Sequence, residues 1–554
     1  MKTNYKIIIL AFMSVLLMTS CADLLTEIPA SYIASASFFN NTANANMAIV
    51  GIYDDLSKLK HYGTAEMYVQ TSDDNYYVSG TASDNSKRDL SHYMFTPGNT
   101  NLGDMWMFKY QGIDRANLAI ENISNIPFTS SADSALLSQY DGEAHFLRAL
   151  LSYDLVRYWG DVPYKSTSSS AIGDAYNDRV DRDTIYNQIV ADLNIAKTKL
   201  AWAKAGSSPE RATQGAARAL LMRVLLSRAG YSLKMDGTLT RPDDTKRTAY
   251  FNAIINEYAA FQLNGYHGLF SSYYQFFKNN SAGILNSQES LFEIAFYTST
   301  GDQEDAGNWG AGIGPLTDAA SKYGRANSYF RVLPEWDEWY EATDIRRVTN
   351  ICKYSVTAAS DSVASTNKYA YYPGKWRRQW MPYPAKDPNN TDVNFCLLRY
   401  ADVILMYAEA LNEVGRTSEA IDALNIVRAR SKATLLSPDF SNYTTLYYPK
   451  NKVNNVLTPK LLPFIPDADN QGKFRTAMYW ERCFELCYEG TRKYDLIRWG
   501  VLYDAIQNMK NTYVISSYPA ATNFIKGKHE LFPIPQKEMD VNFKLNHLNN
   551  PGYN

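Results

Sequence analysis

The chain has 554 residues, and its 55 basic and 57 acidic side chains leave a formal net charge of −2. This balance, without a long block of one sign, argues against a nucleic-acid surface or a polybasic membrane surface. Aromatic residues make up 14% of the chain, and tyrosine alone accounts for 42 positions. Tyrosine combines a flat apolar face with a polar tip, which suits contact with flat, hydroxyl-rich ligands, although many such rings simply cover surface.

The first 20 residues have the layout of a secretory signal. Lys2 and Lys6 precede an apolar run from Ile7 to Met18, which ends at Thr19-Ser20-Cys21. A membrane-spanning helix needs about 20 apolar residues, so this run is too short for one. We therefore predict a lipoprotein signal peptide over residues 1–20, with acylation of Cys21, over the alternative of an ordinary secretion signal. The lipid on Cys21 is then expected to anchor the protein to its membrane.

Signatures of chemistry are sparse. Cys483 and Cys487 are four residues apart without a nearby histidine, which favours buried thiols over a zinc site. Met478 stands where a calcium loop starting at Asp467 would need its closing carboxylate. No nucleophile elbow, P-loop or zinc-protease helix occurs. We expect no cofactor, no metal site and no catalysis, although the acidic residues leave a glycosidase carboxylate pair open.

Helical periodicity dominates the first half of the chain. Apolar residues recurring every three or four positions predict helices over 31–60, 106–123, 143–158, 184–200, 213–228 and 247–261. Residues 71–101 instead are rich in Asp, Asn, Ser and Gly with interleaved tyrosines, and they keep no helical period. This composition predicts a long surface loop, and long ordered loops are usually functional.

The second half alternates between two kinds of sequence. Residues 297–386 contain many glycines and aromatics with few helical runs, which predicts a loop-rich insert. A helical hairpin follows, with one apolar stripe over 397–411, a stop at Gly415 and a second helix that Thr417 is expected to cap. This unit resembles a tetratricopeptide helix pair. Helical spacing assigns three tryptophans to the core, namely Trp106, Trp336 and Trp339.

The predicted fold is mainly α, with tetratricopeptide-like helix pairs forming a scaffold that carries a loop-rich ligand-binding subdomain. The predicted parts are an N-terminal helical part over 21–296 with a binding loop at 71–101, the insert over 297–386, and a C-terminal helical part over 387–554. A polar stretch over 434–472 is expected to leave the helical scaffold.

Four segments resemble the SusD/RagB family of nutrient-binding outer-membrane lipoproteins. They are FLRALLSYDLVRYWGDVPY at 146–164, LRYADVILMYAEALNE at 398–413, ER at 481–482 leading to EGTRKYDLIRWG at 489–500, and LFPIP at 531–535 with NPGY at 550–553. The spacing before NPGY differs slightly from the usual family pattern. We interpret the Arg/Asp pairs of these segments as parts of the scaffold.

The resemblance implies non-catalytic binding of a polysaccharide or oligosaccharide at the cell surface. It also implies delivery of this glycan to a SusC-like TonB-dependent transporter, with the protein held at the outer membrane by the lipid on Cys21. Capture of peptides is an alternative within the family, and a glycoside hydrolase is a less favoured one. No nucleic-acid partner is expected.

In the family, aromatic and polar side chains from loops outside the scaffold generally hold the ligand. The matching places here are the loop at 71–101 and the insert. We expect ligand-binding residues there, namely Asp73, Asp74, Tyr76, Tyr77, Tyr93, Trp309 and Tyr323. The alternatives are a turn-capping role for Asp73 and a packing role for Trp309.

Overall fold

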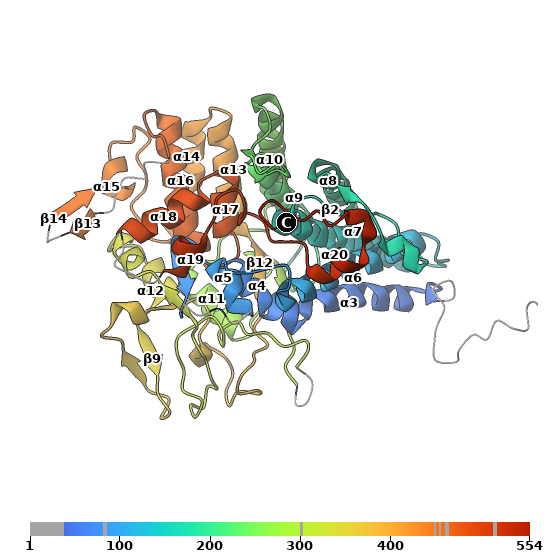
Figure 1. Ribbon diagram of the computed structural model, residues 1–554, viewed down its shortest axis with the longest axis horizontal. Coiled ribbons are helices and arrows are strands. Elements are labelled where there is room, and N and C mark those ends of the chain that lie inside the picture. Colours follow the sequence, from blue (N-terminus) through green and yellow to red (C-terminus); the bar gives the residue numbers. More distant parts are fainter. Residues whose placement is uncertain are drawn as a thin grey trace, which may run out of the picture.

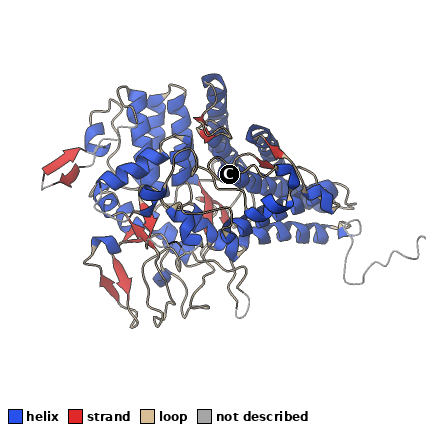
Figure 2. Ribbon diagram, viewed as in Figure 1, coloured by secondary structure: helices blue, strands red, loops and turns tan. Residues whose placement is uncertain are grey.

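The computed structural model describes residues 38–553, apart from 81–82, 84–85, 300–302, 448–449, 454–455, 460–464 and 513–517. Cys21 and the predicted signal peptide lie outside the described residues. Helices make up most of the regular structure, and the strands are short (Figure 2). Within the described ranges, no helix is both long enough and apolar enough to cross a membrane. The predicted mainly α class is confirmed.

The helices form one continuous row of packed pairs. Each helix packs on the next in the order α6 (Thr100–Ile123), α7 (Ser131–Trp159), α8 (Arg182–Lys199), α9 (Gln214–Arg228) and α10 (Asp244–Asn264). The row continues from α10 to α13 (Tyr400–Glu413), which contacts α14 (Thr417–Arg430) and α16 (Asn470–Leu486). Helix α3 (Thr42–Ser57) packs across α6 and α7. The predicted stacking of helix pairs is therefore confirmed.

Polar side chains cap most of these helices at their first backbone N–H groups, which have no partner inside the helix. The capping residues are Asn41, Asn99, Ser130, Asp181, Thr213, Asp243 and Asp469. Gly415 ends α13 in a left-handed conformation with φ of 84°, as predicted. The predicted cap at Thr417 is wrong, because Arg416 occupies that position and the Thr417 hydroxyl donates to Asn412 instead.

The insert leaves and re-enters the scaffold at one strand pair. β6 (Ser290–Ile294) runs antiparallel to β12 (Phe395–Arg399), and both are buried throughout. The residues between them form the loops and short strands that project from one side of the helices in Figure 1. Helical periodicity predicts a helix from 397, but Leu397 and Leu398 belong to β12. Leu398 lies opposite Phe292 of β6, and both leucines are buried.

The remaining elements are short and lie between the main helices or inside the insert. Before the insert they are η1 (Leu59–Gly63), α4 (Ala65–Val69), β1 (Tyr76–Val78), α5 (Lys87–His92), β2 (Val162–Pro163), η2 (Ile172–Ala175), β3 (Arg179–Val180), β4 (Ser232–Leu233), β5 (Leu239–Thr240) and α11 (Tyr273–Ser281). The insert contains β7 (Phe330–Val332), η3 (Pro334–Trp339), α12 (Arg346–Asn350), β8 (Ile351–Cys352), β9 (Tyr354–Val356), β10 (Ser362–Ala364), η4 (Lys368–Ala370), β11 (Tyr372–Pro373) and η5 (Arg378–Trp380). After α14 follow α15 (Tyr443–Tyr447), β13 (Lys450–Val453), β14 (Val456–Pro459), α17 (Arg492–Arg498), α18 (Leu502–Thr512), α19 (Pro519–Asn523), α20 (Gln536–Val541) and η6 (Phe543–Leu545).

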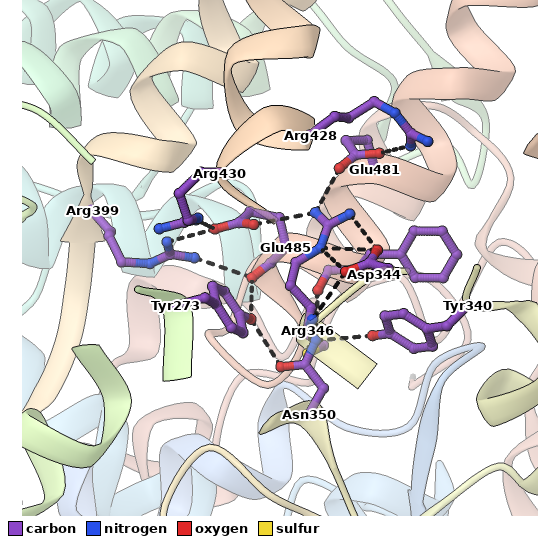
Figure 3. Close-up of polar contacts among 12 residues, drawn as sticks. Tyr273, Tyr340, Asp344, Arg346, Asn350, Arg399, Arg428, Arg430, Glu481 and Glu485 are labelled. Atoms are coloured by element: carbon purple, nitrogen blue, oxygen red, sulfur yellow. Dashed lines mark hydrogen bonds and ion pairs between the residues drawn. The ribbon is translucent and has the colours of Figure 1, made fainter. Parts of the chain in front are cut away.

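A buried network of arginines and glutamates joins the insert to the scaffold (Figure 3). Glu485 on α16 accepts from Arg399 at 2.7 Å, from Arg346 at 3.2 Å and from Arg430. Glu481, one turn earlier, pairs with Arg346 at 2.5 Å and Arg428 at 2.6 Å. Burial alone raises the pKa of Glu485, but the three guanidinium groups outweigh it and hold the pKa well below the usual range. The carboxylate is therefore charged and fully paired.

The sequence-assigned core residues take their expected places. Trp106, Trp336 and Trp339 are buried, and the cysteines after Cys21 that the structure describes are buried and free. Buried thiols are confirmed at Cys483 and Cys487.

Replacement of Glu485 by alanine should leave buried guanidinium groups without their shared partner. Breaking a buried ion pair costs about 3–5 kcal/mol, so the urea midpoint of Glu485→Ala should fall strongly. The matched control is Glu419→Ala, because Glu419 pairs with Arg416 on the surface of α14 and is half exposed. Equal urea midpoints for the two variants would contradict the assigned role of the network.

Candidate ligand-binding face

One short strand pair brings the two loop-rich stretches of the sequence together. β1, inside the predicted loop 71–101, runs antiparallel to β7 in the insert, with Tyr77 opposite Arg331. The backbone N–H of Ser79 then donates to the carbonyl of Tyr329 at 2.8 Å, which extends the pairing by one residue. The two stretches lie far apart in the sequence, with most of the N-terminal helical part between them, yet they form one surface.

Side chains alternate between the two faces of this pair, as strand geometry requires. Tyr76 and Val78 of β1, with Phe330 and Val332 of β7, are buried on the inner face. The outer face carries Tyr77, Tyr329 and Arg331, together with Tyr369 from the neighbouring η4. We call these four residues the tyrosine platform. Tyr329 and Tyr369 are 36% and 37% exposed, which leaves ring surface open to a ligand.

Arg331 is the cation of the tyrosine platform. Its guanidinium lies 4.6 Å from the ring centroid of Tyr372 and donates to the carbonyls of Ser328 and Phe330. It forms no ion pair with any residue that the structure describes. Burial lowers the pKa of this guanidinium below its usual value, but arginine stays charged at any physiological pH. Its Nε and Nη2 groups are thus uncommitted donors within the described chain.

A second exposed cluster lies on the insert. The rings of Tyr323 and Tyr383 meet edge to face at 5.6 Å, and the Lys322 ammonium lies within about 5 Å of both ring centroids. Tyr383 is 59% exposed and Tyr323 is half-buried. Of the ligand-binding residues predicted from the sequence, Tyr323 thus retains surface for contact.

The two predicted aspartates are fully buried. Asp74 receives two hydrogen bonds from Arg492 and one from Tyr479, so it is an ion-pair partner in the core. Asp73 accepts the backbone N–H groups of Asn75 at 2.9 Å and Tyr76 at 3.3 Å, which is the turn-capping alternative. Burial and the charge of Asp74 raise the pKa of Asp73. Burial also favours a raised pKa for Asp74, but Arg492 outweighs it and lowers the value.

The aromatic predictions need a similar correction. Trp309 is fully buried, stacks on Phe395 at 4.1 Å and donates its indole N–H to the carbonyl of Tyr62 at 3.2 Å. It is therefore a packing anchor. Tyr76 and Tyr93 are 2% exposed, and Tyr77 is 9% exposed beneath Arg331. Side chains without exposed surface cannot contact a ligand at the surface. Of these four predicted aromatic residues, only Tyr77 belongs to the tyrosine platform, and it lies at the base of the platform.

Comparisons with known proteins agree with the resemblance. Residues 328–553 match the family model described as "SusD family", and residues 29–226 match that described as "Starch-binding associating with outer membrane". SusD-like protein P25 of Formosa agariphila is 25% identical over 94% of this chain and 94% of its own length. A SusD homolog from Bacteroides thetaiotaomicron shares the fold with a TM-score of 0.77 and 29% identity, over 94% of this chain and 98% of that one.

The chain belongs to the SusD/RagB family. Proteins of this family bind glycans at the cell surface without catalysis. A further structural neighbour, surface glycan-binding protein A from Bacteroides thetaiotaomicron in complex with laminarihexaose, has a TM-score of 0.64 and 19% identity, over 90% of this chain and 97% of that one. At this identity the likeness shows the fold alone.

Sequence reasoning missed the exposed residues of this candidate face. Tyr329, Arg331 and Tyr369 lie inside the predicted insert but were not selected. A signal was present, because Tyr329-Phe330-Arg331-Val332 alternates polar-tipped and apolar residues with the period of a strand. The pairing of this segment with β1 depends on contacts between distant parts of the chain, which periodicity cannot reveal.

Replacement of Trp309 tests its corrected role in this SusD-like fold. Trp309→Ala removes a buried ring and should lower the free energy of unfolding by about 3–5 kcal/mol. Tyr323→Ala, at a half-buried position of the same insert, should change stability little. Urea unfolding followed by circular dichroism measures both. A stable Trp309→Ala variant that has lost only ligand binding would restore the original prediction.

Lys493 on α17 allows a test, by the pH dependence of stability, of the buried contacts around Tyr93. Its ammonium donates to the carbonyl of Val69 at 2.9 Å and lies 4.7 Å from the ring centroid of Tyr93, and burial lowers its pKa to about 7. Between pH 7 and 10 the unfolded chain therefore binds more protons at this site, so this lysine makes stability rise with pH.

The variant Lys493→Met removes this titration. Between pH 7 and pH 9 the free energy of unfolding of the unaltered protein should rise relative to that of Lys493→Met, by on the order of 1–2 kcal/mol. Urea unfolding at a series of pH values measures the difference. A difference that stays constant with pH would contradict a shifted pKa at Lys493.

Proposed function

We propose that this protein captures a glycan on the tyrosine platform and passes it to a SusC-like TonB-dependent transporter in the outer membrane, to which the lipid on Cys21 anchors it. The observation that carries this proposal is the β1–β7 pairing, which places Tyr77, Tyr329, Arg331 and Tyr369 on one outward face. Membership in the SusD/RagB family supports the class of ligand.

The chemistry of the platform suits a sugar. The exposed rings of Tyr329 and Tyr369 offer flat apolar faces for the C–H groups of a pyranose, while their hydroxyls donate and accept hydrogen bonds. The uncommitted N–H groups of Arg331 can donate to hydroxyl oxygens of the same ligand. The platform is an open surface that holds the ligand by non-covalent contacts. The glycan can therefore leave it intact. Capture followed by transfer therefore needs no catalysis.

The strand pairing at the platform favours a glycan over the peptide alternative. An extended peptide binds by adding a strand to an unpaired sheet edge. β7 has no such edge here, because β1 pairs with it on one side and Val332 donates to the carbonyl of Tyr371 at 3.0 Å on the other. What β7 presents to a ligand is side chains.

Two structural neighbours indicate which glycan to test first. One is a laminarin-binding SusD-like protein, and another was solved with laminarihexaose. One of the matching family models is described as starch-binding. Laminarin and starch are therefore the first two polysaccharides of the panel.

The double variant Tyr329→Ala/Arg331→Ala should weaken glycan binding at least about tenfold, since ring stacking and charge-assisted hydrogen bonds together contribute about 2 kcal/mol or more. Affinity electrophoresis in gels containing laminarin, starch or other polysaccharides measures the change on the chain that starts after Cys21. The matched control is Tyr250→Ala/Arg241→Ala, which removes the same residue types from the scaffold side of the molecule.

The same mixtures are analysed for shortened products. Retardation by a glycan that the platform variant loses and the control keeps, without shortened products, is the expected result. Shortened products would contradict the non-catalytic role. Equal retardation of the platform variant and its control would show that the glycan binds elsewhere, and binding of peptides without any glycan would favour the alternative ligand class.

A further inference from the structure

A large groove lies along α6, away from the tyrosine platform. Its volume is about 1090 Å³, and none of its lining residues belongs to the platform or to the insert. One wall comes from the first turns of α6 and the residues before it, another from the segment that follows β2, and a third from the start of α20. These elements lie next to one another in Figure 1. The volume fits a ligand of several rings.

The largely buried ring of Trp106 lies at the floor of the groove and presents an open hydrogen-bond donor there. Trp106 is 6% exposed. Its ring packs edge to face on Trp159 with the centroids 5.1 Å apart, and the ring centroid of Tyr110 lies 4.8 Å away. Its indole Nε1 donates to no residue of the described chain, and it is not among the enclosed side-chain atoms that lack a partner. This N–H therefore keeps access to the groove that Trp106 lines.

The rim combines hydrogen-bond donors and acceptors that the described chain leaves uncommitted. Gln111 is exposed on α6, and its amide makes no hydrogen bond with any described residue. Asp114 accepts the backbone N–H of Ser169 at 2.8 Å through Oδ1, while Oδ2 has no described partner. The ammonium of Lys60, which is 71% exposed, reaches Asp104 at 3.5 Å. Amide, carboxylate and ammonium groups thus surround an apolar floor.

We propose that this groove is a second saccharide-binding site, which takes a short oligosaccharide of the glycan captured at the platform. The inference rests on the proposed function for the class of ligand. A sugar needs apolar contact surface with both donors and acceptors around it. Met107 and Val541, which are 49% and 59% exposed, supply the apolar surface of the groove, while the Trp106 indole N–H, Gln111 and Asp114 supply the donors and acceptors. The site adds a second point of contact for a repeating polymer, and two linked contacts hold a polymer more tightly than either one alone.

Two other ligand classes fit the groove less well. An anion meets several carboxylates on the rim, including Asp104, Asp114 and Asp540. An extended peptide needs backbone N–H and carbonyl partners, but Pro97, Pro163 and Pro535 line the groove without an N–H to donate. The carbonyl of Pro163 already accepts the Tyr110 hydroxyl at 2.6 Å. Side chains rather than strand edges therefore meet the ligand.

A glycine on α6 allows the groove to be filled without disturbing the fold. Gly103 lines the groove, and a Cβ atom built there meets no other atom within 4 Å. Gly103→Tyr should therefore be stable and should place a ring in the ligand space. The matched control is Gly51→Tyr, because a Cβ atom at Gly51 on α3 also meets nothing within 4 Å and Gly51 does not line the groove.

The experiment is calorimetric titration of laminarihexaose and maltohexaose into four proteins. They are the unaltered chain after Cys21, the platform variant Tyr329→Ala/Arg331→Ala, and this platform variant combined with either Gly103→Tyr or Gly51→Tyr. We expect the platform variant to keep weaker binding of one oligosaccharide, which Gly103→Tyr reduces at least about tenfold and Gly51→Tyr leaves unchanged. Thermal unfolding of each variant shows that the fold is retained.

Three other results are distinguishable. Equal binding by the two glycine variants overturns the groove as a site while leaving the proposed function intact. Complete loss of binding in the platform variant also overturns the second site and supports the platform. No binding of either oligosaccharide by the unaltered chain overturns the groove assignment for these sugars, and the polysaccharide panel on the same protein then decides the proposed function separately.

Discussion

The position of the loop-rich insert depends on a cluster of buried opposite charges at one end of α16. Glu481 and Glu485 lie one turn apart on the same helix face, and between them they hold Arg346 of the insert, Arg399 of β12 and two arginines of α14. Burying each ion costs several kcal/mol, and the cost is offset only where every partner is in place. The cluster therefore stabilises one arrangement of insert and scaffold, because any other arrangement would leave buried charges unpaired.

This constraint explains how an open surface can be built on loops. The described elements of the insert are short, so contacts with the scaffold add to the insert's own hydrogen bonds in fixing its position. Arg346 lies a few residues beyond η3, and β7 leads directly into η3, so the ion cluster fixes the base from which the tyrosine platform rises. The exposed rings are thus held by rigid support beneath them, which lowers the ordering cost when a ligand binds.

The family motifs describe this support and not the ligand. Arg482 pairs with Asp402 and Asp495, and Arg498 pairs with Glu409, so charged residues from two of the segments that resemble the family meet each other inside the fold. Arg492 from the same stretch binds Asp74. A resemblance carried by such residues identifies the scaffold, while the tyrosine platform that we propose as the glycan site lies outside the motifs.

Sequence periodicity predicted the helical part well because amphipathic helices are local. The stripes in α8 and α13 and the stop at Gly415 needed only neighbouring residues. The candidate site depends on contacts between residues far apart in the sequence, and this explains why several of its residues were predicted wrongly. Asp74 looked like an exposed loop acid until Arg492, 418 residues further along, was seen to pair with it. Trp309 was predicted to offer its ring to a ligand from a loop, but Phe395 covers the face of this ring. The pairing of Tyr77 with Arg331 could not be predicted from residues near either of them in the sequence.

The proposed function requires that the β1–β7 face holds the glycan. A crystal structure of the chain after Cys21 with the best-binding oligosaccharide tests it most directly. We expect sugar density stacked on Tyr329 or Tyr369 and within hydrogen-bond distance of Arg331. Well-defined sugar density that leaves this face empty at saturating ligand would contradict it.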